Sequence, residues 1–581
     1  MSFRKRANGR EIALDEIFLD SSNLPHLDGA QFEGRVERPI STVALAGIGV
    51  VFTIAALVFM GRAYDLQVLN GSAYADISRE NRLSRSVVFA PRGVIYDKHG
   101  TPLAWNEAPE ALVATSTAST TVASTYSFPV RQYRNIGLSH VLGFVSYPRQ
   151  DASGEWWREE YEGVSGAEHI FDSTLHGENG SLLIETDARG AVQREHIVVP
   201  PVEGRDITLT IDASVQEKLH MILSTHAEQY GFRGGSGIIM DVKNGDLLAL
   251  TSFPGYDNTA FAAGDSTVIS AANENPRSPL LNRAASGLYA PGSIVKPIFA
   301  SAALAEGIID PEKQILSTGQ LVVPNPYNPD QPSIFRDWKA HGWVDMRKAI
   351  AVSSDQYFYA IGGGVPDQAG LGIERIDDYA RAFGLGRLTG IPFATEAEGV
   401  IPTPEWKEKV FDGDPWRLGD TYITAIGQFG FQITPLQAIR FVAAIANGGT
   451  LIEPRLTVSS LFLDSWGDDS PYGESVGVSD EHLQIVREGM REAVHSDAAD
   501  RTARALDLGG IEIAGKTGTA EVGERNQFMN SWVVGFWPAS DPHYAFAVVL
   551  ERAPAGTLSG ASPAMQPFFN WLIAEKPEYI Q

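Results

Sequence analysis

Apolar residues are concentrated in a few runs along the chain, and the densest run lies near its start. Residues 40–61 form 22 consecutive positions without a charged side chain, and Arg38 and Arg62 bracket them. A helix of this length crosses a hydrocarbon core of about 30 Å. A signal peptide fits less well, because the run is long and follows a largely polar stretch of 39 residues. We expect one transmembrane helix here, and a buried core helix is the alternative.

Basic residues decide the expected orientation of this helix. More of them precede the span than closely follow it: Arg4, Lys5, Arg6, Arg10, Arg35 and Arg38 against Arg62, Arg79 and Arg82. Lys and Arg favour the cytoplasmic side of a membrane span. We therefore expect residues 1–39 to be a cytoplasmic tail and the part after the span to lie outside the cytoplasmic membrane.

Residues 62–205 carry short alternating runs that are typical of β-strands. Residues 94–96 and 103–105 flank a turn, which indicates a hairpin. Residues 180–212 alternate in the same way, whereas residues 115–127 are rich in Ser and Thr and have the composition of a linker. We expect a small β-rich domain in this part of the chain.

From residue 206 the pattern is that of one large globular domain, residues 206–581. Residues 236–252 predict two strands joined by an Asn-Gly turn, which is a strong hairpin signal. Three further strand-like runs lie near the C-terminus, at residues 511–520, 531–537 and 544–550. Together these runs predict five strands.

Helical patterns fill the sequence between these strands. After Ser479, a plausible N-cap, the apolar residues from Leu483 to Val494 are spaced 3, 4 and 4 apart and form one stripe. A last helix is expected near residues 563–575. Strands at both ends of a domain with helices between them predict an α+β fold of packed layers.

Composition narrows the possible functions. The chain has 46 Lys and Arg residues against 71 Asp and Glu residues, a net charge of −25, which is unsuited to binding nucleic acid. It has no cysteine, so disulfides, thiol catalysis and cysteine-ligated metals are excluded. Its histidines are scattered without a metal-binding spacing, and we expect neither a metal nor another cofactor.

Three short motifs carry candidate chemistry, and the first is Ser293-x-x-Lys296. Residues three apart share one face of a helix, so Lys296 can reach the Ser293 hydroxyl and act as the base that a serine nucleophile needs. Pro297 is tolerated only in a first turn, which puts Ser293 at a helix N-terminus, where backbone N–H groups face the reacting centre. The alternative is that Ser293 is an N-cap and Lys296 a surface charge.

The second motif is Ser353-Ser354-Asp355, which precedes an aromatic run closed by the glycines at 362–364. We expect a short buried helix with a glycine C-cap, and the Ser353 hydroxyl in the cleft as a proton relay. The alternative is helix capping by Ser354 or Asp355.

The third motif, Lys516-Thr517-Gly518-Thr519, lies in a strand-like run. Gly518 allows a ligand backbone to approach the strand closely. Lys516 can bind a carboxylate, and its charge can help keep Lys296 neutral, the form that accepts a proton. The alternative is an edge-strand lysine that discourages aggregation.

The three motifs in this order resemble those of the penicillin-binding proteins and serine β-lactamases. The flanking sequence is similar to that of class B penicillin-binding proteins, and Asp355 within Ser-Ser-Asp-x-Tyr-Phe-Tyr is similar to their elongation type, called penicillin-binding protein 2. The similar segments are residues 90–97, 163–168, 289–292, 426–428, 434–437 and 531–536.

This resemblance implies a transpeptidase domain with a five-stranded antiparallel sheet and helices on both faces. It also implies that residues 62–205 are a pedestal, or dimerisation-like, domain. The family usually inserts a larger head between the positions of Leu112 and Leu138, so we expect a reduced head here.

The implied activity is peptidoglycan D,D-transpeptidation in cell elongation and shape maintenance. Ser293 would attack the carbonyl of a D-Ala–D-Ala stem peptide, and Lys296 would take its proton. Ser353 would pass a proton toward the leaving amine, and Asp355 would help order that side of the cleft. A second stem peptide would then resolve the acyl-enzyme into a cross-link.

The third motif would bind the donor peptide. Thr517 and Thr519 would hold its carboxylate with Lys516, beside Gly518. The backbone N–H groups of Ser293 and Thr519 would form the oxyanion hole. β-Lactams would mimic the donor and stay attached to Ser293.

The resemblance implies a membrane glycosyltransferase of the elongation machinery as a partner. Two alternative functions remain. A β-lactam or peptidoglycan sensor is disfavoured, because the tail carries no recognisable effector domain. An anchored serine β-lactamase is disfavoured, because the chain has a pedestal and lacks the Glu-x-x-Leu-Asn motif of one β-lactamase class.

Overall fold

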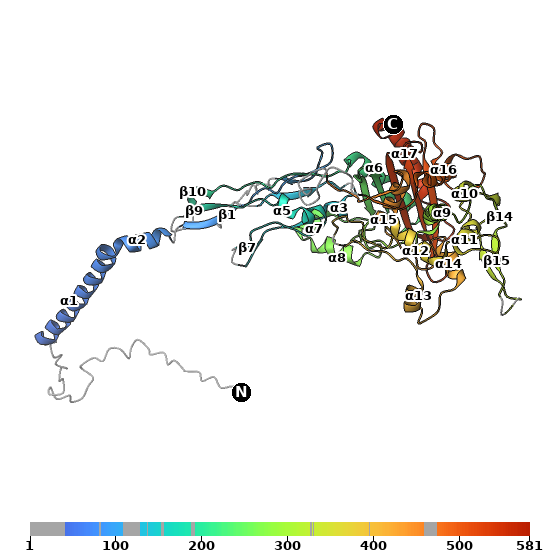
Figure 1. Cartoon of the computed structure of the whole chain (residues 1–581). Helices are drawn as coiled ribbons and strands as arrows, with labels where there is room; N and C mark the ends of the chain where they lie inside the picture. The colour runs from blue at the N-terminus through green and yellow to red at the C-terminus, as the bar shows by residue number, and fades with distance from the viewer. Residues whose placement is uncertain are drawn as a thin grey trace, which may run out of the picture. The chain divides into compact units, whose positions relative to one another are not determined.

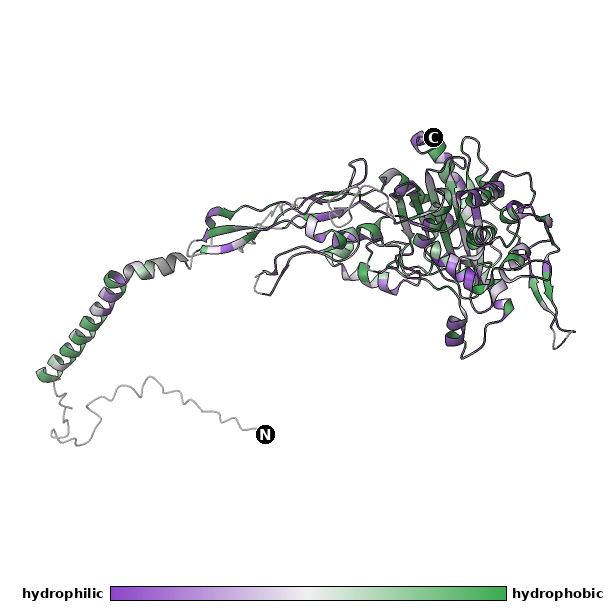
Figure 2. Ribbon diagram, in the orientation of Figure 1, coloured by the Kyte–Doolittle hydropathy of each residue, from purple (hydrophilic) through white to green (hydrophobic). Residues whose placement is uncertain are grey.

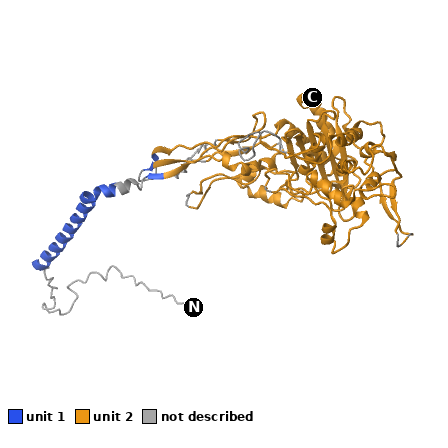
Figure 3. Ribbon diagram, in the orientation of Figure 1, with its two compact units in different colours: residues 1–84, 185–193 blue, residues 85–184, 194–581 orange. Residues whose placement is uncertain are grey.

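The computed structural model describes residues 41–80, 83–107, 128–135, 137–152, 156–186, 192–325, 328, 330–393, 395–457 and 473–580 (Figure 1). The expected tail at residues 1–39, the Ser/Thr-rich stretch at 115–127 and most of the expected head region lie outside the described residues. The chain forms two compact units, residues 1–84 with 185–193 and residues 85–184 with 194–581 (Figure 3).

The apolar run near the N-terminus forms helix α1 (Thr42–Tyr64), which continues as the π-helix η3 (Asp65–Leu69) and is followed by α2 (Gly71–Glu80). Ser41 caps α1, because its hydroxyl accepts a hydrogen bond from the Ala44 N–H. Helix α1 is hydrophobic over most of its length (Figure 2), and its large apolar side chains are exposed, which is unfavourable in water. Within the described residues, this is the one helix long and apolar enough to cross a membrane.

Small sheets make up the β-rich segment that follows. Its strands are β1 (Leu83–Val88), β2 (Ile95–Tyr96), β3 (Pro102–Glu107), β4 (Val130–Tyr133), β5 (Val145–Ser146), β6 (Arg149–Gln150), β7 (Trp156–Arg158), β8 (Glu162–Gly163), β9 (Gly180–Thr186), β10 (Val192–Val199) and β11 (Ile207–Thr208). The expected hairpin forms between β2 and β3. The two larger sheets have the orders β11-β2-β3-β4 and β1-β9-β10.

A buried ion network joins two of the sequence segments singled out above, residues 90–97 and 163–168. The carboxylate of Glu168 accepts hydrogen bonds from Arg92 Nε at 2.6 Å and from Arg131 Nε at 2.7 Å, and all three side chains are buried. Buried charges are tolerated only when they are paired and hydrogen-bonded. The network therefore fixes these two segments against each other.

The five predicted strands form one antiparallel sheet in the large domain. They are β12 (Gly234–Asp241), β13 (Leu247–Phe253), β20 (Ala514–Val522), β21 (Phe528–Trp537) and β22 (Tyr544–Pro554). Their order is β13-β12-β22-β21-β20, so the last strand of the chain is the central one and β20 lies at an edge. The predicted α+β fold is confirmed.

Both faces of this sheet are buried, as the alternation of side chains along a strand requires. Successive residues of β22 enter two different hydrophobic cores: Ala545, Ala547 and Val549 in one, and Phe546, Val548 and Leu550 in the other. Helices α6 (Ala213–Tyr230) and α17 (Ala561–Glu575) contribute to the second core, and α9 (Lys296–Ala305) and α15 (Pro435–Ala446) to the first. The expected layers of helices on both faces are therefore present.

Shorter helices and hairpins complete the described fold. The helices are α3 (Ser139–Leu142), α4 (Gly166–Ile170), α5 (Asp172–Leu175), α7 (Asn258–Ala263), α8 (Ser266–Glu274), α10 (Met346–Ala351), α11 (Asp355–Gly363), α12 (Gly372–Ala382), α13 (Pro404–Val410), α14 (Leu418–Thr424) and α16 (Asp480–His495), with the 3₁₀ turns η4 (Gly292–Val295), η6 (Arg504–Leu506) and η7 (Pro577–Tyr579). The remaining strands are β14 (Ile315–Ser317), β15 (Gln320–Val323), β16 (Ser333–Arg336), β17 (Gly342–Val344), β18 (Thr450–Ile452) and β19 (Gly473–Ser475). Ser479 caps α16, as expected.

Candidate active site

Ser293 lies in the 3₁₀ turn η4, which leads directly into helix α9. Pro297 occupies the first turn of α9, where its missing N–H leaves no hydrogen bond unmade. Every residue of α9 before Ala305 is buried, whereas Ser293 is half-buried. The expected position of Ser293 at the start of a buried helix is therefore observed.

Lys296 is fully buried, so it is not the surface charge of the alternative interpretation. Its Nζ lies 2.6 Å from Asp355 Oδ1, 2.8 Å from the backbone oxygen of Ser353 and 3.2 Å from Ser353 Oγ. These hydrogen bonds lead to the second motif rather than to the Ser293 hydroxyl. The first two motifs therefore meet through Lys296.

The second motif combines a tight turn with a helix cap. Ser353 has a φ of +57°, a left-handed conformation that is unfavourable for any residue with a Cβ. Ser354 is the N-cap of α11, and its hydroxyl accepts a hydrogen bond from the Tyr357 N–H. Gly364 forms the expected glycine C-cap. Ser354 therefore caps the helix, and the Ser353 hydroxyl remains available to Lys296 and Lys516.

The third motif lies on β20, and Lys516 is fully buried although β20 is an edge strand. Lys516 Nζ lies 2.8 Å from Ser353 Oγ and 2.9 Å from the backbone oxygen of Thr517. A lysine that protects an edge from aggregation must be exposed. The burial of Lys516 therefore contradicts the edge-protection alternative, and Ser353 Oγ bridges the two lysines.

Electrostatics in this cluster perturb Lys516. Burial and, next, the positive charge of Lys296 lower the pKa of Lys516 well below its ordinary value, while Asp355 acts in the opposite direction. The sequence interpretation had Lys516 keeping Lys296 neutral. In the structure the direct partner of Lys296 is the carboxylate of Asp355, and Lys516 contacts the Ser353 hydroxyl.

Glycines allow β20 to approach the nucleophile turn closely. A Cβ on Gly292, whose φ is +53°, would lie 2.7 Å from the Thr519 oxygen, and a Cβ on Gly518 would lie 2.8 Å from the Pro291 oxygen. Only glycine fits either position without displacing backbone. The backbone just before Ser293 therefore lies next to the backbone of β20 at Thr519. The predicted oxyanion hole requires this arrangement.

The two threonines of the third motif differ in exposure. Thr519 is exposed and Thr517 is half-buried. Alternation along a strand puts both on the face opposite Lys516. Gln428, from one of the segments that resemble the family, extends its amide Nε2 to 3.5 Å from the Thr519 oxygen.

Sequence reasoning missed four residues near the second motif: Asp337 and Trp338 contact the motif or the residue before it, and His341 and Asp500 lie behind Asp337. Asp337 Oδ2 accepts a hydrogen bond from the Ser354 hydroxyl at 2.8 Å, and His341 contacts both Asp337 and Asp500. Asp337 and His341 lie in a loop, and outside a helix their separation in sequence does not predict a contact. Asp500 is far away in the sequence and carries no signal.

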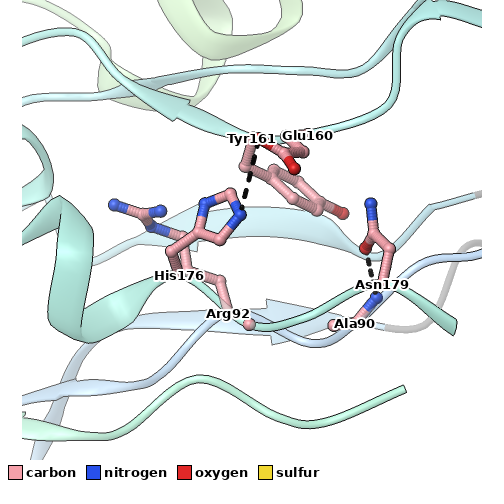
Figure 4. Close-up of a pocket in the computed structure, with 7 residues that line it drawn as sticks. Ala90, Arg92, Glu160, Tyr161, His176 and Asn179 are labelled. Atoms are coloured by element: carbon pink, nitrogen blue, oxygen red, sulfur yellow. Dashed lines mark hydrogen bonds and ion pairs between the residues drawn. The ribbon is translucent and has the colours of Figure 1, made fainter. Parts of the chain in front are cut away.

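A small pocket in the β-rich segment lies apart from this cluster (Figure 4). It is lined by Ala90, Arg92, Glu160, Tyr161, His176, Gly177 and Asn179. His176 Nε2 lies 3.7 Å from Glu160 Oε2, and the Ala90 N–H donates to Asn179 Oδ1 at 2.9 Å. Across the described residues, no group of three or more His, Cys, Asp or Glu side chains is placed to hold a metal ion.

Comparison with known families places this cluster within a recognised domain. The family described as the penicillin binding protein transpeptidase domain matches residues 235–573. The family described as the penicillin-binding protein dimerisation domain matches residues 121–209. The three motifs all lie in the first of these matches.

Individual relatives extend the similarity over most of the chain. The peptidoglycan D,D-transpeptidase MrdA of Haemophilus influenzae is 29% identical over 93% of this chain and 92% of its own length. The crystal structure of penicillin-binding protein 2 from Pseudomonas aeruginosa is 28% identical, with a TM-score of 0.66, and covers 86% of this chain and 98% of that chain. A structure of a peptidoglycan synthase complex that coordinates polymerisation and crosslinking contains a chain that is 26% identical, with a TM-score of 0.67 over 92% of this chain and 99% of that chain.

Proposed function

The chain belongs to the penicillin-binding protein transpeptidases and is a peptidoglycan D,D-transpeptidase, and on this premise we propose which of its residues carry out the reaction. The observation that supports the assignment is the buried cluster in which Ser353 Oγ bridges Lys296 and Lys516 beside the Ser293 turn. The penicillin-binding protein 2 relatives favour this function over the sensor and β-lactamase alternatives.

The proposed first step is attack of Ser293 Oγ on the carbonyl carbon between the two D-alanines of a stem peptide. Its proton passes to Lys296, three residues further along, as Lys296 gives a proton through Ser353 Oγ to Lys516, whose lowered pKa favours the neutral amine that can accept it. The C–N bond then breaks, and the leaving amine of the terminal D-alanine takes this proton back from the lysine cluster through Ser353 Oγ. The product is an ester between Ser293 and the shortened peptide.

Charge balance in the cluster supports this proton path. Two buried lysines share one carboxylate, Asp355, and the lowered pKa of Lys516 favours one neutral amine in the pair. Ser353 Oγ is within hydrogen-bond distance of both lysines. A proton can therefore move between Lys296, Ser353 and Lys516 without leaving the buried site, and it can return when the amine of a second stem peptide cleaves the ester.

We propose that β20 binds the donor peptide along its open edge. Thr517 and Thr519 offer hydroxyl groups to the terminal carboxylate, and Lys516 contributes positive potential when it is protonated. The backbone N–H groups of Ser293 and Thr519 stabilise the tetrahedral oxyanion, which is worth about 3–4 kcal/mol per donor in enzymes where a donor has been removed. The close approach of Gly292 to Thr519 supports this placement.

The anchoring and partners of the chain complete the proposal. Helix α1 is consistent with anchoring in a membrane, and the excess of basic residues before it supports a cytoplasmic N-terminus with the enzyme outside the cytoplasmic membrane. We propose the domain boundaries 1–39, 40–61, 62–205 and 206–581. The relative solved in a complex that coordinates polymerisation and crosslinking supports a membrane glycosyltransferase as partner.

Labelling with a fluorescent penicillin tests the nucleophile. We expect one covalent adduct per chain on Ser293, with slow release, because the label mimics the donor peptide. Ser293→Ala should abolish labelling. Ser301→Ala is the matched control, since Ser301 lies on the same helix but its hydroxyl donates to the Pro297 oxygen inside the core. Intact-protein mass spectrometry that finds the adduct on another residue, or labelling that survives in Ser293→Ala, contradicts the assignment.

A further inference from the structure

The loop between β16 and β17 supports the second motif from behind. Asp337 Oδ2 accepts hydrogen bonds from the Ser354 hydroxyl at 2.8 Å and from the Gln356 N–H at 3.0 Å. The Trp338 indole Nε1 donates to the Val352 oxygen at 3.1 Å. These contacts hold the backbone on both sides of Ser353.

His341 lies between two carboxylates in the same loop. Its Nδ1 is 2.7 Å from Asp500 Oδ2, and its Nε2 is 3.6 Å from Asp337 Oδ1. The imidazole and the Asp337 side chain are fully buried. The other charged groups that face it are Lys339, whose Nζ is 3.5 Å from Asp500 Oδ2, and Lys348, whose Nζ donates to the His341 backbone oxygen at 3.5 Å. The Asp500 side chain is 16% exposed, whereas the fully buried carboxylate of Asp337 requires a positive partner.

The protonation of His341 follows from these neighbours. Burial lowers the pKa of His341, but Asp337 and Asp500 outweigh it and raise the pKa above the ordinary 6.5. Burial likewise raises the pKa of Asp337, but the hydrogen bonds to this carboxylate and the charge of Lys296 bring it down to about 2. The two carboxylates therefore favour the protonated form of His341.

We propose that His341 is a positioning residue of the transpeptidase reaction, which in its protonated form fixes Asp337 and through it the turn that presents Ser353 to Lys296 and Lys516. The left-handed conformation of Ser353 is one that the surrounding structure must hold in place. The inference rests on the proposed function, because it assumes that Ser353 relays protons. It assigns a further role to a residue outside the three motifs.

The pH dependence of acylation tests the role of His341. The rate constant for labelling of the full chain by a fluorescent penicillin is measured from about pH 6 to about pH 9, for wild type and His341→Gln. Glutamine keeps a hydrogen-bond donor but carries no charge. We expect His341→Gln to react about tenfold more slowly at the acidic end. The two proteins should converge at the basic end, where wild-type His341 loses its proton.

Two more variants sharpen the test. His495→Gln is the matched control, because His495 also contacts a carboxylate, Asp507 at 3.0 Å, but has no contact with the second motif; its labelling rate should equal that of wild type at every pH. Asp500→Asn removes one of the two charges that hold the His341 proton, so the decline in rate should move to lower pH by about one unit.

The outcomes separate this inference from the proposed function. A rate ratio between wild type and His341→Gln that is constant with pH, together with an unmoved profile in Asp500→Asn, overturns the positioning role and leaves the nucleophile assignment intact. Absence of labelling at Ser293 in wild type at every pH overturns the proposed function itself. If His341→Gln does not fold, the profile of Asp500→Asn against wild type decides the question.

Discussion

Ser353 offers the sharpest test of the proton path, because its hydroxyl and its backbone can be changed separately. The hydroxyl bridges Lys516 at 2.8 Å and Lys296 at 3.2 Å. The backbone has a φ of +57°. This conformation is strained for alanine as it is for serine, whereas glycine adopts it without strain. Ser353→Ala therefore removes the hydroxyl alone, and Ser353→Gly removes the hydroxyl and the strain.

The geometry sets the expected magnitudes. Hydrogen bonds that involve a charged group contribute about 1.5–3 kcal/mol. Loss of one such bond in the transition state slows acylation by about tenfold to 150-fold. We expect this reduction in both variants. Replacement of a left-handed serine by glycine relieves about 1 kcal/mol of backbone strain, so Ser353→Gly should be more stable than Ser353→Ala.

The assay combines two measurements on each variant, the rate constant for labelling by a fluorescent penicillin and the midpoint of thermal unfolding. Slow labelling in both variants, with the higher midpoint in Ser353→Gly, supports a chemical role for the hydroxyl. Wild-type labelling by Ser353→Ala would refute the relay. Restored labelling in Ser353→Gly would also refute it, because it would show that the strained turn rather than the hydroxyl limits the rate.

Three other changes test further parts of the structure. Gly292→Ala would place a methyl group 2.7 Å from the Thr519 oxygen, so we expect labelling to slow by more than about tenfold, and an unchanged rate would contradict the close approach. Glu168→Gln leaves two buried guanidinium groups without their shared carboxylate and should reduce the free energy of unfolding by about 3–5 kcal/mol. We expect faster limited proteolysis of the β-rich segment, and an unaltered digestion pattern would argue against a stabilising role of this ion network. The pKa of Asp337 is about 2 in the fold against an ordinary 3.8, because hydrogen bonds and the charge of Lys296 overcome burial, so Asp337→Asn should lose about 2 kcal/mol at neutral pH. A lowered carboxyl pKa stabilises the fold at any pH above the pKa of the unfolded chain, and this stabilisation is lost as the pH falls toward the pKa of the folded chain. Denaturant titrations should therefore show the stability difference between wild type and Asp337→Asn shrinking between about pH 4 and pH 2. A stability difference that does not vary with pH would count against the lowered pKa.

Most strands of the large domain could be predicted from the sequence because they contain continuous apolar runs, which are typical of strands buried on both faces; β20 is the exception, since its sequence AGKTGTAEV is largely polar. Their ends were less predictable. β22 extends to Pro554, beyond the expected end at residue 550, because its last residues pair with β21 outside the apolar run. The strand order was not predictable, because apolar runs do not specify which neighbours they join.

The candidate site was predictable where local sequence determines the geometry. Pro297 fixes the start of the nucleophile helix, and the aromatic run with its glycines fixes α11. Contacts between distant segments were not predictable. The contact between Lys296 and Asp355, and the burial that lowers the pKa of Lys516, exist only in the folded chain.

The loop that contains His341 shows the same limit. Asp337 and His341 have no motif to mark them, and Asp500 belongs to a segment that follows α16. Their contacts depend on tertiary packing, so no local propensity or spacing indicates them.

The position of β22 has a consequence for the folding of the enzyme during its synthesis. β22 is synthesised last among the five strands but lies between β12 and β21, and it pairs with a strand from the beginning of the domain. Pairings so distant in the chain carry a large loop-closure cost and are associated with slow folding. β20, which supports the nucleophile turn, joins the sheet through β21, so the catalytic cluster cannot form on a chain that ends before Tyr544, although Ser293, Lys296 and Lys516 are already present. With Ser293 as the proposed nucleophile, we expect covalent labelling by penicillin to report also that synthesis and folding have reached the C-terminus, and we expect Ser293 to stay inactive during biogenesis until the last strand is in place.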